Sequence, residues 1–254
     1  MAITIKSERE IELMAEAGKI LERVHNELEK ALRPGMSTKD IDTLGEEIIR
    51  SYGCIPSFLN YNGYPASICV SVNQEVVHGI PDKHRIVQEG DIVSLDAGVI
   101  YKGYHSDAAR THAVGEASEE AKKLIQVTKE CFFEGIKFAK AGNHLFDISG
   151  AIGRYAEERG YGVVRDLCRH GIGTALHEAP EIPNYEVGRK GVRLRPGMTL
   201  AIEPMINIGT YEVDWLDDDW TVVTRDGSLS AHYENTILIT EGEPRILSLT
   251  CENE

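Results

Sequence analysis

The strongest constraint on the fold is an internal repeat that runs through most of the chain. Six positions recur at one spacing of 107 residues: Gly35 and Gly142, Asp40 and Asp147, Ile41 and Ile148, Gly53 and Gly160, Gly90 and Gly197, Asp96 and Glu203. Two motifs recur at spacings of 99 and 127 residues: His78-Gly79-Ile80-Pro81 with His177-Glu178-Ala179-Pro180, and His105-Ser106-Asp107 with His232-Tyr233-Glu234. The pieces keep their order while the spacing changes, which indicates loop insertions between them. The repeat therefore predicts two related α/β halves, residues about 7–114 and about 118–240, that face each other.

Each predicted half begins with two helices and continues into strands. Ser7 and Glu10 form a capping-box pattern ahead of apolar residues at helical spacing, and Pro34-Gly35 ends that helix. The other helices are expected from near 37 to 53, from 118 to about 140 and from about 146 to 159. Strands are expected at 67–73, 91–100, 104–114, 198–207, 220–224 and 232–240. Because no Pro/Gly/Ser-rich linker separates the halves, we predict one α+β domain over residues 1–254.

Charge and cysteine usage disfavour several classes of protein. The formal net charge of -14 repels phosphate backbones and anionic lipids, so we expect no specific DNA and no membrane among the partners. The N-terminus has no long apolar run, which predicts neither a signal peptide nor a membrane span. Five cysteines without a Cys-x-x-Cys pair argue against a disulfide framework and a thiolate zinc site. A reducing compartment, and hence a cytoplasmic location, is the simplest interpretation.

Carboxylates at repeat-equivalent positions carry the main chemical signal. Asp96 and Glu203 each end an apolar strand-like run, and Asp107 and Glu234 follow on the next expected strand. For one such carboxylate, a turn cap or a pair with Arg110 or Arg165 is the ordinary explanation. Four together repel one another, whereas two divalent cations would cancel their charge. A mostly oxygen ligand set with one imidazole suits Mn, Fe, Co or Zn.

The histidines divide into three groups. Four have the ordinary interpretation of surface or core residues: His25, His84, His112 and His144. His105 and His232 lie two residues before carboxylates, which on a strand puts them on the same face, next to the ligands. Three others are candidates for the site itself: His78, His170 and His177. His170 opens His170-Gly171-Ile172-Gly173, a predicted glycine-rich turn that lets the backbone approach a partner closely.

Aromatic and sulfur-bearing side chains supply a possible apolar pocket. The candidates are Tyr61, Tyr64, Cys69 and Trp220. Plain core packing explains such residues about as well from their spacing alone.

Taken together, these motifs resemble the type I methionine aminopeptidases, which have the pita-bread (creatinase-like) fold. The matching stretches are Asn73–Pro81, Leu95-Asp96-Ala97-Gly98, Ser106-Asp107, His170-Gly171-Ile172-Gly173, His177-Glu178-Ala179-Pro180, Ile202-Glu203-Pro204-Met205 and Tyr233-Glu234. The resemblance spans nearly the whole chain and implies two pseudo-symmetric halves with antiparallel sheet and outer helices. The 26 positions from His177 to Glu203 leave no room for the helical insertion of type II enzymes, and the length resembles the short bacterial form.

The resemblance also implies a role for each site residue. The metal ligands would be Asp96, Asp107, His170, Glu203 and Glu234, with Asp107 and Glu234 bridging two cations. His78 and His177 would contact the substrate, and the methionine pocket would be formed by Tyr61, Tyr64, Cys69 and Trp220. A metal-activated water would attack the scissile carbonyl, with Glu203 as the base, to remove the initiator methionine of nascent proteins when the second residue is small. A monomer is expected, and association with the ribosome is left open.

Some positions depart from the family pattern, and two alternatives remain. Arg169, Leu176, Phe58, His232 and Asn235 differ from common family residues without removing a ligand. One alternative is another pita-bread hydrolase, such as a proline-specific peptidase, although those enzymes carry a large extra N-terminal domain. The other is a non-catalytic binding module that keeps the fold, although such proteins usually lose ligands.

Overall fold

The computed structural model describes residues 3–249, and its helices begin where the repeat predicts them. The helices are α1 (Glu8–Ala31), α2 (Thr38–Ser51), α3 (Glu119–Ile136) and α4 (Leu145–Glu157), with a short 3-10 helix at Tyr61–Gly63. The repeated aspartates cap α2 and α4. The Asp40 carboxylate accepts from the Ser37 amide at 2.9 Å, and that of Asp147 accepts from the His144 amide at 2.8 Å. Each bond satisfies an amide that the helix start leaves without a partner.

The strands form small sheets in which every pairing is antiparallel. Strands of the first half are β1 (Ile55–Pro56), β2 (Ile68–Val72), β3 (Glu75–Val77), β4 (Ile92–Tyr101) and β5 (Tyr104–Ala113). Those of the second half are β6 (Gly162–Val163), β7 (Cys168–Gly171), β8 (Glu178–Pro183), β9 (Thr199–Ile202), β10 (Met205–Asn207), β11 (Val213–Trp215), β12 (Val222–Thr224), β13 (Ser230–His232), β14 (Asn235–Leu238) and β15 (Arg245–Ile246). Strands β1, β4 and β2 adjoin in that order with β5 beside β4, and β15-β14-β9-β7-β8 forms the largest sheet of the second half.

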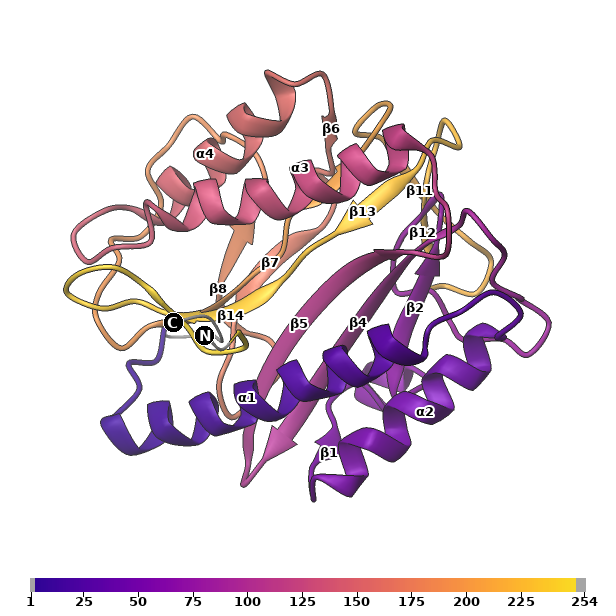
Figure 1. The fold of residues 1–254 in the computed structure, drawn as a ribbon. Helices are drawn as coiled ribbons and strands as arrows, with labels where there is room; N and C mark the ends of the chain where they lie inside the picture. Colours follow the sequence, from indigo (N-terminus) through magenta and orange to yellow (C-terminus); the bar gives the residue numbers. More distant parts are fainter. Residues whose placement is uncertain (1–2, 250–254) are drawn as a thin grey trace.

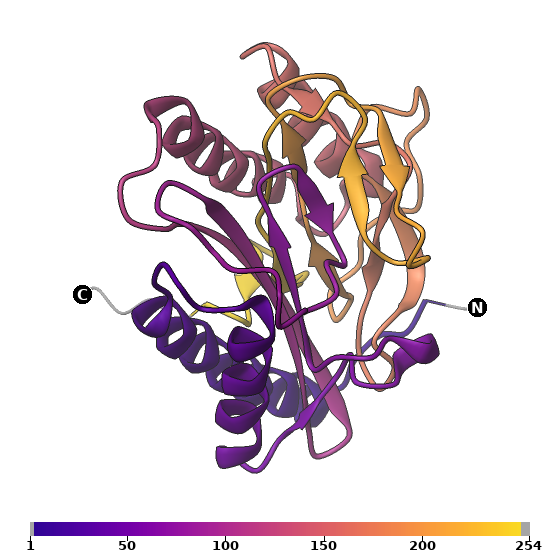
Figure 2. The same ribbon diagram turned by 90° about the vertical axis from the view of Figure 1, so that its right-hand side faces the viewer.

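Helices cover the outer side of each half. Figure 1 shows α1 and α2 along β4 and β5, while α3 and α4 lie on the opposite side of the molecule, over strands of the second half. Figure 2 shows the same two helical layers from the side, with the strands between them. Two apolar cores fill these layers, one centred on Leu21, Ile49 and Leu95 and the other on Phe132, Ile152 and Leu200. The antiparallel α+β architecture predicted from the sequence is confirmed.

The two halves meet along β5 and residues 234–236, where the chain enters β14. The Glu234 amide donates to the Ala109 carbonyl at 3.0 Å, and the Asp107 amide donates to the Thr236 hydroxyl at 2.9 Å. This seam places Asp107 and Glu234 next to each other although 127 residues separate them in the chain.

Several sequence-based boundaries were wrong, each for a local reason. Helix α3 ends at Ile136 instead of about Lys140, because the chain turns back with Phe138 N–H bonded to Gly135. The expected strand 198–207 is interrupted at Glu203-Pro204, where proline has no amide to donate. The expected strand 232–240 is likewise interrupted between β13 and β14. The short strands of 162–183 were not predicted.

Two site positions also differ from expectation. His170 and Gly171 belong to β7 and pair with β9, so the predicted turn at His170 is wrong. Asp96 lies in the middle of β4 and not at a strand end.

Among residues 3–249, no helix is long and apolar enough to cross a membrane. The four cysteines of that range are unpaired, and Cys251 lies outside it.

Candidate metal centre

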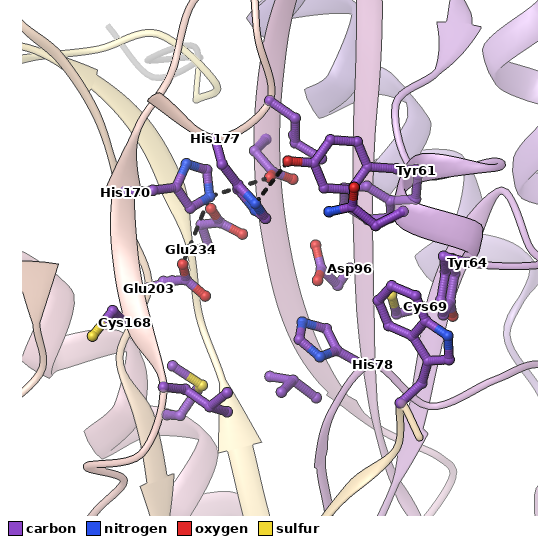
Figure 3. A pocket seen from close by; sticks show the side chains of 18 residues that line it. Tyr61, Tyr64, Cys69, His78, Asp96, Cys168, His170, His177, Glu203 and Glu234 are labelled. Atoms are coloured by element: carbon purple, nitrogen blue, oxygen red, sulfur yellow. Dashed lines mark hydrogen bonds and ion pairs between the residues drawn. The ribbon is translucent and has the colours of Figure 1, made fainter. Parts of the chain in front are cut away.

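A cleft of about 160 Å³ opens where the two halves face each other. Figure 3 shows His170, Glu203 and Glu234 on one wall, with Asp96, His78 and Tyr61 on the opposite wall. The cleft is lined by every site residue predicted from the sequence: Asp96, Asp107, His170, Glu203, Glu234, His78, His177, Tyr61, Tyr64, Cys69 and Trp220. The fold therefore brings the predicted site residues together in one cleft.

The first half supplies two carboxylates on one face of a hairpin. In the register of β4 and β5, Asp96 lies opposite Ala109 and Asp107 lies opposite Gly98. Directly paired residues share a face and alternate residues return to it, so Asp96 and Asp107 project into the cleft together. Both side chains are nearly buried, at 9% and 4% exposure.

The second half supplies an imidazole and two glutamates. His170 on β7 pairs with Ala201 on β9, and Glu203 follows two residues later on the same face. Nε2 of His170 lies 3.8 Å from Oδ2 of Asp107 and 3.8 Å from Oε1 of Glu203. Ligand atoms of Asp107, His170 and Glu234 all lie within 4.8 Å of one another.

A second group of ligand atoms includes His232, which the sequence placed only beside the ligands. Glu203, His232 and Glu234 also offer atoms within 4.8 Å of one another. Nε2 of His232 lies 3.4 Å from Oε2 of Glu203, so His232 lies beside a predicted ligand, as the sequence indicated. His105 behaves differently, because its Nδ1 contacts the Ser57 hydroxyl at 3.0 Å. Asp96 lines the cleft without joining either compact group.

The two arginines that could have formed salt bridges with these carboxylates have other partners. Arg110 donates to the Glu234 backbone carbonyl and, at 2.6 Å, to the Asn235 side chain, while Arg165 pairs with Glu157 at 3.3 Å. Oδ1 of Asp96, Oδ1 of Asp107 and Oε1 of Glu234 are buried without a hydrogen-bond partner among the described residues. Buried acceptors of this kind are costly unless a ligand completes them.

The electrostatics of the cluster indicate a deficit of positive charge. Burial raises the pKa of Asp96 to about 7. Burial and the neighbouring carboxylates raise the pKa of Asp107 and of Glu234 well above their ordinary values. Glu203 differs, because His232 and His170 outweigh the effect of its burial and hold its pKa below the ordinary value. Divalent cations fit this donor set, since they would neutralise the carboxylates and complete their unpartnered oxygens.

The two histidines outside the ligand groups lie on opposite walls of the cleft. His177 packs edge to face on His170 with ring centroids 4.2 Å apart, and its Nδ1 contacts the Tyr61 hydroxyl at 3.0 Å. Burial lowers the pKa of His177 to about 4. His78 has a left-handed backbone with φ 59°, and burial lowers its pKa too. Neutral imidazoles suit hydrogen bonding to a substrate.

An apolar wall adjoins the carboxylates. The rings of Tyr64 and Trp220 meet edge to face at 5.1 Å, and Cys69 on β2 lies opposite Asp96 on β4. The Tyr64 hydroxyl donates to the Gly79 carbonyl at 3.0 Å, so this ring is fixed and mostly apolar on the cleft side. Lining residues that the sequence did not single out include Val77, Leu167, Cys168 and Met205. The sequence signal that could have identified them is their position next to the motifs that contain His78, His170 and Glu203.

The residues that depart from the family pattern leave all five predicted ligands in the cleft. Phe58 and Leu176 line the cleft. Arg169 alternates with His170 on β7, so its fully buried side chain points to the other face, where it donates to the Pro183 carbonyl and, at 3.3 Å, to Ser149 of α4. Arg169 pairs with Ile182 and His170 with Glu181, and the register between β7 and β8 shifts only after His170.

Comparison with known proteins agrees with this geometry. The family model described as metallopeptidase family M24 matches residues 12–241. A methionine aminopeptidase from Clostridium acetobutylicum is 58% identical over 98% of this chain and 100% of its own length. The crystal structure of a methionine aminopeptidase from Thermotoga maritima, 47% identical, superposes with a TM-score of 0.95 over 98% of this chain and 100% of its own. An Xaa-Pro dipeptidase from Bacillus anthracis, 27% identical, reaches a TM-score of 0.80, but the match over 98% of this chain covers only 63% of the dipeptidase.

Proposed function

The chain belongs to metallopeptidase family M24, and we propose that five residues of its cleft hold two divalent cations beside which the peptide bond is cut. The fold is the pita-bread fold predicted from the sequence. The enzyme is a metal-dependent aminopeptidase that removes N-terminal methionine by hydrolysis. The proposed ligands are Asp96, Asp107, His170, Glu203 and Glu234. Co, Mn, Fe or Zn suits this mostly oxygen set with one imidazole.

One observation carries this proposal: carboxylates from both halves converge on the His170 imidazole without a lysine or arginine partner in the described part of the chain. Asp107 and Glu203 each place an oxygen 3.8 Å from Nε2 of His170, and no lysine or arginine among residues 3–249 pairs with Asp96, Asp107 or Glu234. Bound cations would supply Lewis acidity and lower the pKa of water at the site.

The remaining side chains bind and orient the substrate. The thioether of an N-terminal methionine fits against Tyr61, Tyr64, Cys69 and Trp220, where aromatic rings favour contact with sulfur. The carboxylates beside this pocket attract the free α-amine, which favours chain ends over internal peptide bonds.

Three residues act at the scissile bond in this proposal. His177 donates to the scissile carbonyl and stabilises the negative charge that develops on its oxygen, a contribution of several kcal/mol for well-placed donors. Glu203, the carboxylate whose pKa stays low, accepts the proton of the attacking water and passes it to the leaving amine. His78 hydrogen-bonds the substrate backbone from the opposite wall.

The test combines metal content with a peptide panel. The purified protein should retain about two equivalents of metal per chain and cleave Met-Ala-Ser, while Xaa-Pro peptides stay intact. Cleavage of Xaa-Pro peptides in preference to Met-Ala-Ser would favour a proline-specific peptidase. Absence of metal after incubation with Mn or Co would favour the non-catalytic alternative.

The wider setting is also part of the proposal. We place residues 1–254 in one catalytic domain of two related halves, since one apolar cluster beside the cleft contains residues of both, such as Phe58 and Leu176. The unpaired cysteines of the described range support a reducing, cytoplasmic compartment. The substrate is the N-terminal methionine of nascent polypeptides, the enzyme acts as a monomer, and association with the ribosome would bring it to them.

A further inference from the structure

The segment before α1 leads into the first half in sequence but is bonded to the second. The Lys6 amide donates to the Gly197 carbonyl at 2.8 Å. Nζ of Lys6 lies 2.7 Å from Oε2 of Glu178, and the Lys6 side chain is only 4% exposed. This pair therefore connects the start of the chain to the residue that follows His177 directly.

Glu178 uses both carboxylate oxygens to tie down the loop that carries His177. Oε2 accepts from Lys6 and, at 2.7 Å, from the Thr4 hydroxyl, while Oε1 accepts from the Ala175 amide at 3.3 Å. The loop of residues 172–177 connects β7, which bears His170, to β8, which begins at Glu178. A charged pair thus spans the base of this loop.

The loop has little freedom while this pair is in place. A Cβ atom at Gly173 would lie 2.4 Å from Oε1 of Glu178 and 2.7 Å from Nζ of Lys6. The Gly173 carbonyl also accepts from the His105 amide at 2.8 Å. At its far end, the loop presents the His177 ring to Tyr61.

Stability alone is a weak explanation for such a pair. Burying two charges costs desolvation energy that their attraction barely repays, so buried pairs often fix a conformation instead. Other lysine pairs of the described chain have more exposed lysines, such as Lys39 with Asp42, whose lysine is 49% exposed.

We propose that Lys6 is a positioning residue for the reaction: through Glu178 it fixes the loop that aims His177 at the substrate carbonyl. The inference rests on the proposed role of His177. The segment before α1 thereby becomes part of the catalytic apparatus without touching the substrate. A small displacement of a positioned group is enough to lower the rate strongly.

Lys6→Met removes the charge and keeps much of the stem. We expect a fall in kcat of about 10-fold with little change in KM, as for an interaction needed mainly in the transition state. Lys6→Arg should restore most of the rate. Metal content should equal that of wild type, because no ligand has changed. Lys39→Met is the matched control, since it breaks a pair of 2.6 Å to the buried Asp42 and should leave kcat unchanged.

The decisive measurement is a double-mutant cycle with His177→Ala. If Lys6 acts through His177, Lys6→Met should lower kcat less than about 2-fold once His177 is gone. An equal loss in both backgrounds would overturn the inference, as would unchanged kcat in Lys6→Met. If Lys6→Met does not fold, Glu178→Gln enters the same cycle with the same two outcomes. The proposed role of His177 fails separately, when His177→Ala alone keeps the wild-type kcat.

Discussion

The rings of His170 and His177 lie edge to face with centroids 4.2 Å apart, yet they have different neighbours. Nε2 of His170 faces the carboxylates of Asp107 and Glu203 at 3.8 Å. Nδ1 of His177 faces the Tyr61 hydroxyl at 3.0 Å. Removing one or the other of these adjacent imidazoles should therefore impair the enzyme in different ways.

His170→Ala removes the only imidazole of the five proposed ligands. We expect weaker metal binding, and a rate that partly returns when Mn or Co is added in excess, because mass action refills a weakened site. A titration that follows rate and bound metal together measures this.

His177→Ala leaves the proposed ligands whole. It should bind metal like wild type and lose roughly 10–10³-fold in rate, the effect of one lost oxyanion donor. Added metal should not restore the rate. Rescue of His177→Ala together with no rescue of His170→Ala would reverse the two assignments.

Glu203→Gln tests the proposed base. The amide cannot accept the proton of water and carries no charge for a cation, so turnover should fall by at least roughly 10²–10⁴-fold. Because glutamine keeps the shape of the side chain, the circular dichroism spectrum should match wild type. A variant that keeps more than a tenth of the wild-type kcat with metal added would show that Glu203 is not the base.

The repeat made much of the fold predictable because matched residues have the same local structural role in both halves. Gly35 and Gly142 have φ of 89° and 92°, and Gly90 and Gly197 have φ of 89° and 86°, values that suit glycine and few other residues. Asp40 and Asp147 cap equivalent helices. Such constraints are local, so they are visible in the sequence.

The features that escaped prediction depend on contacts between distant segments. Strand β7 is only four residues long. Its last two residues, His170 and Gly171, open a glycine-rich sequence that resembles a turn. It is a strand because β8 and β9 bond to it on both sides. In the same way, the contact of Lys6 with Glu178 joins residues 172 positions apart, and no local sequence pattern predicts it.

The residue after methionine should be small. Tyr61 on one wall contacts His177 on the other at 3.0 Å, and the cleft is only about 160 Å³, so a large second side chain should have little room. Peptides with Ala, Gly or Ser in the second position should be cut well, and those with Lys or Leu poorly. The protein's own Met1-Ala2, outside the described residues, should be a substrate. Mass spectrometry of protein from a host without competing activity checks this, and Met1 retained on active enzyme would contradict it.

Gly79→Ala should destabilise the protein and slow it. Its Cβ would lie 2.4 Å from the Val70 carbonyl oxygen, a backbone atom that cannot swing away. We expect a loss of about 1–3 kcal/mol in the free energy of unfolding, as for overpacked interiors, and a lower kcat because His78 is the preceding residue. Gly242→Ala is the control, since nothing lies within 4 Å of its added Cβ. Equal denaturation midpoints for the two variants would refute the packing argument.

His25 should make the fold less stable as the pH falls. Its side chain is 3% exposed, its Nε2–H donates to the Ala108 carbonyl at 2.9 Å, and its Nδ1 has no partner among residues 3–249. Burial first, and then the charges of Arg110 and His112, lower the pKa of His25 well below its ordinary value. Below about pH 6.5, His25 therefore binds a proton in the unfolded chain but not in the folded chain. The free energy of unfolding should fall by up to about 1.4 kcal/mol for each unit by which the pH is lowered.

His25→Gln retains a donor for Ala108 but does not titrate. Urea unfolding of both proteins from pH 8 to pH 5, with metal chelated, should give a difference between their unfolding free energies that is flat above about pH 7 and shifts in favour of the variant below it. A difference that stays constant over the whole range would show that His25 is not buried in its neutral form.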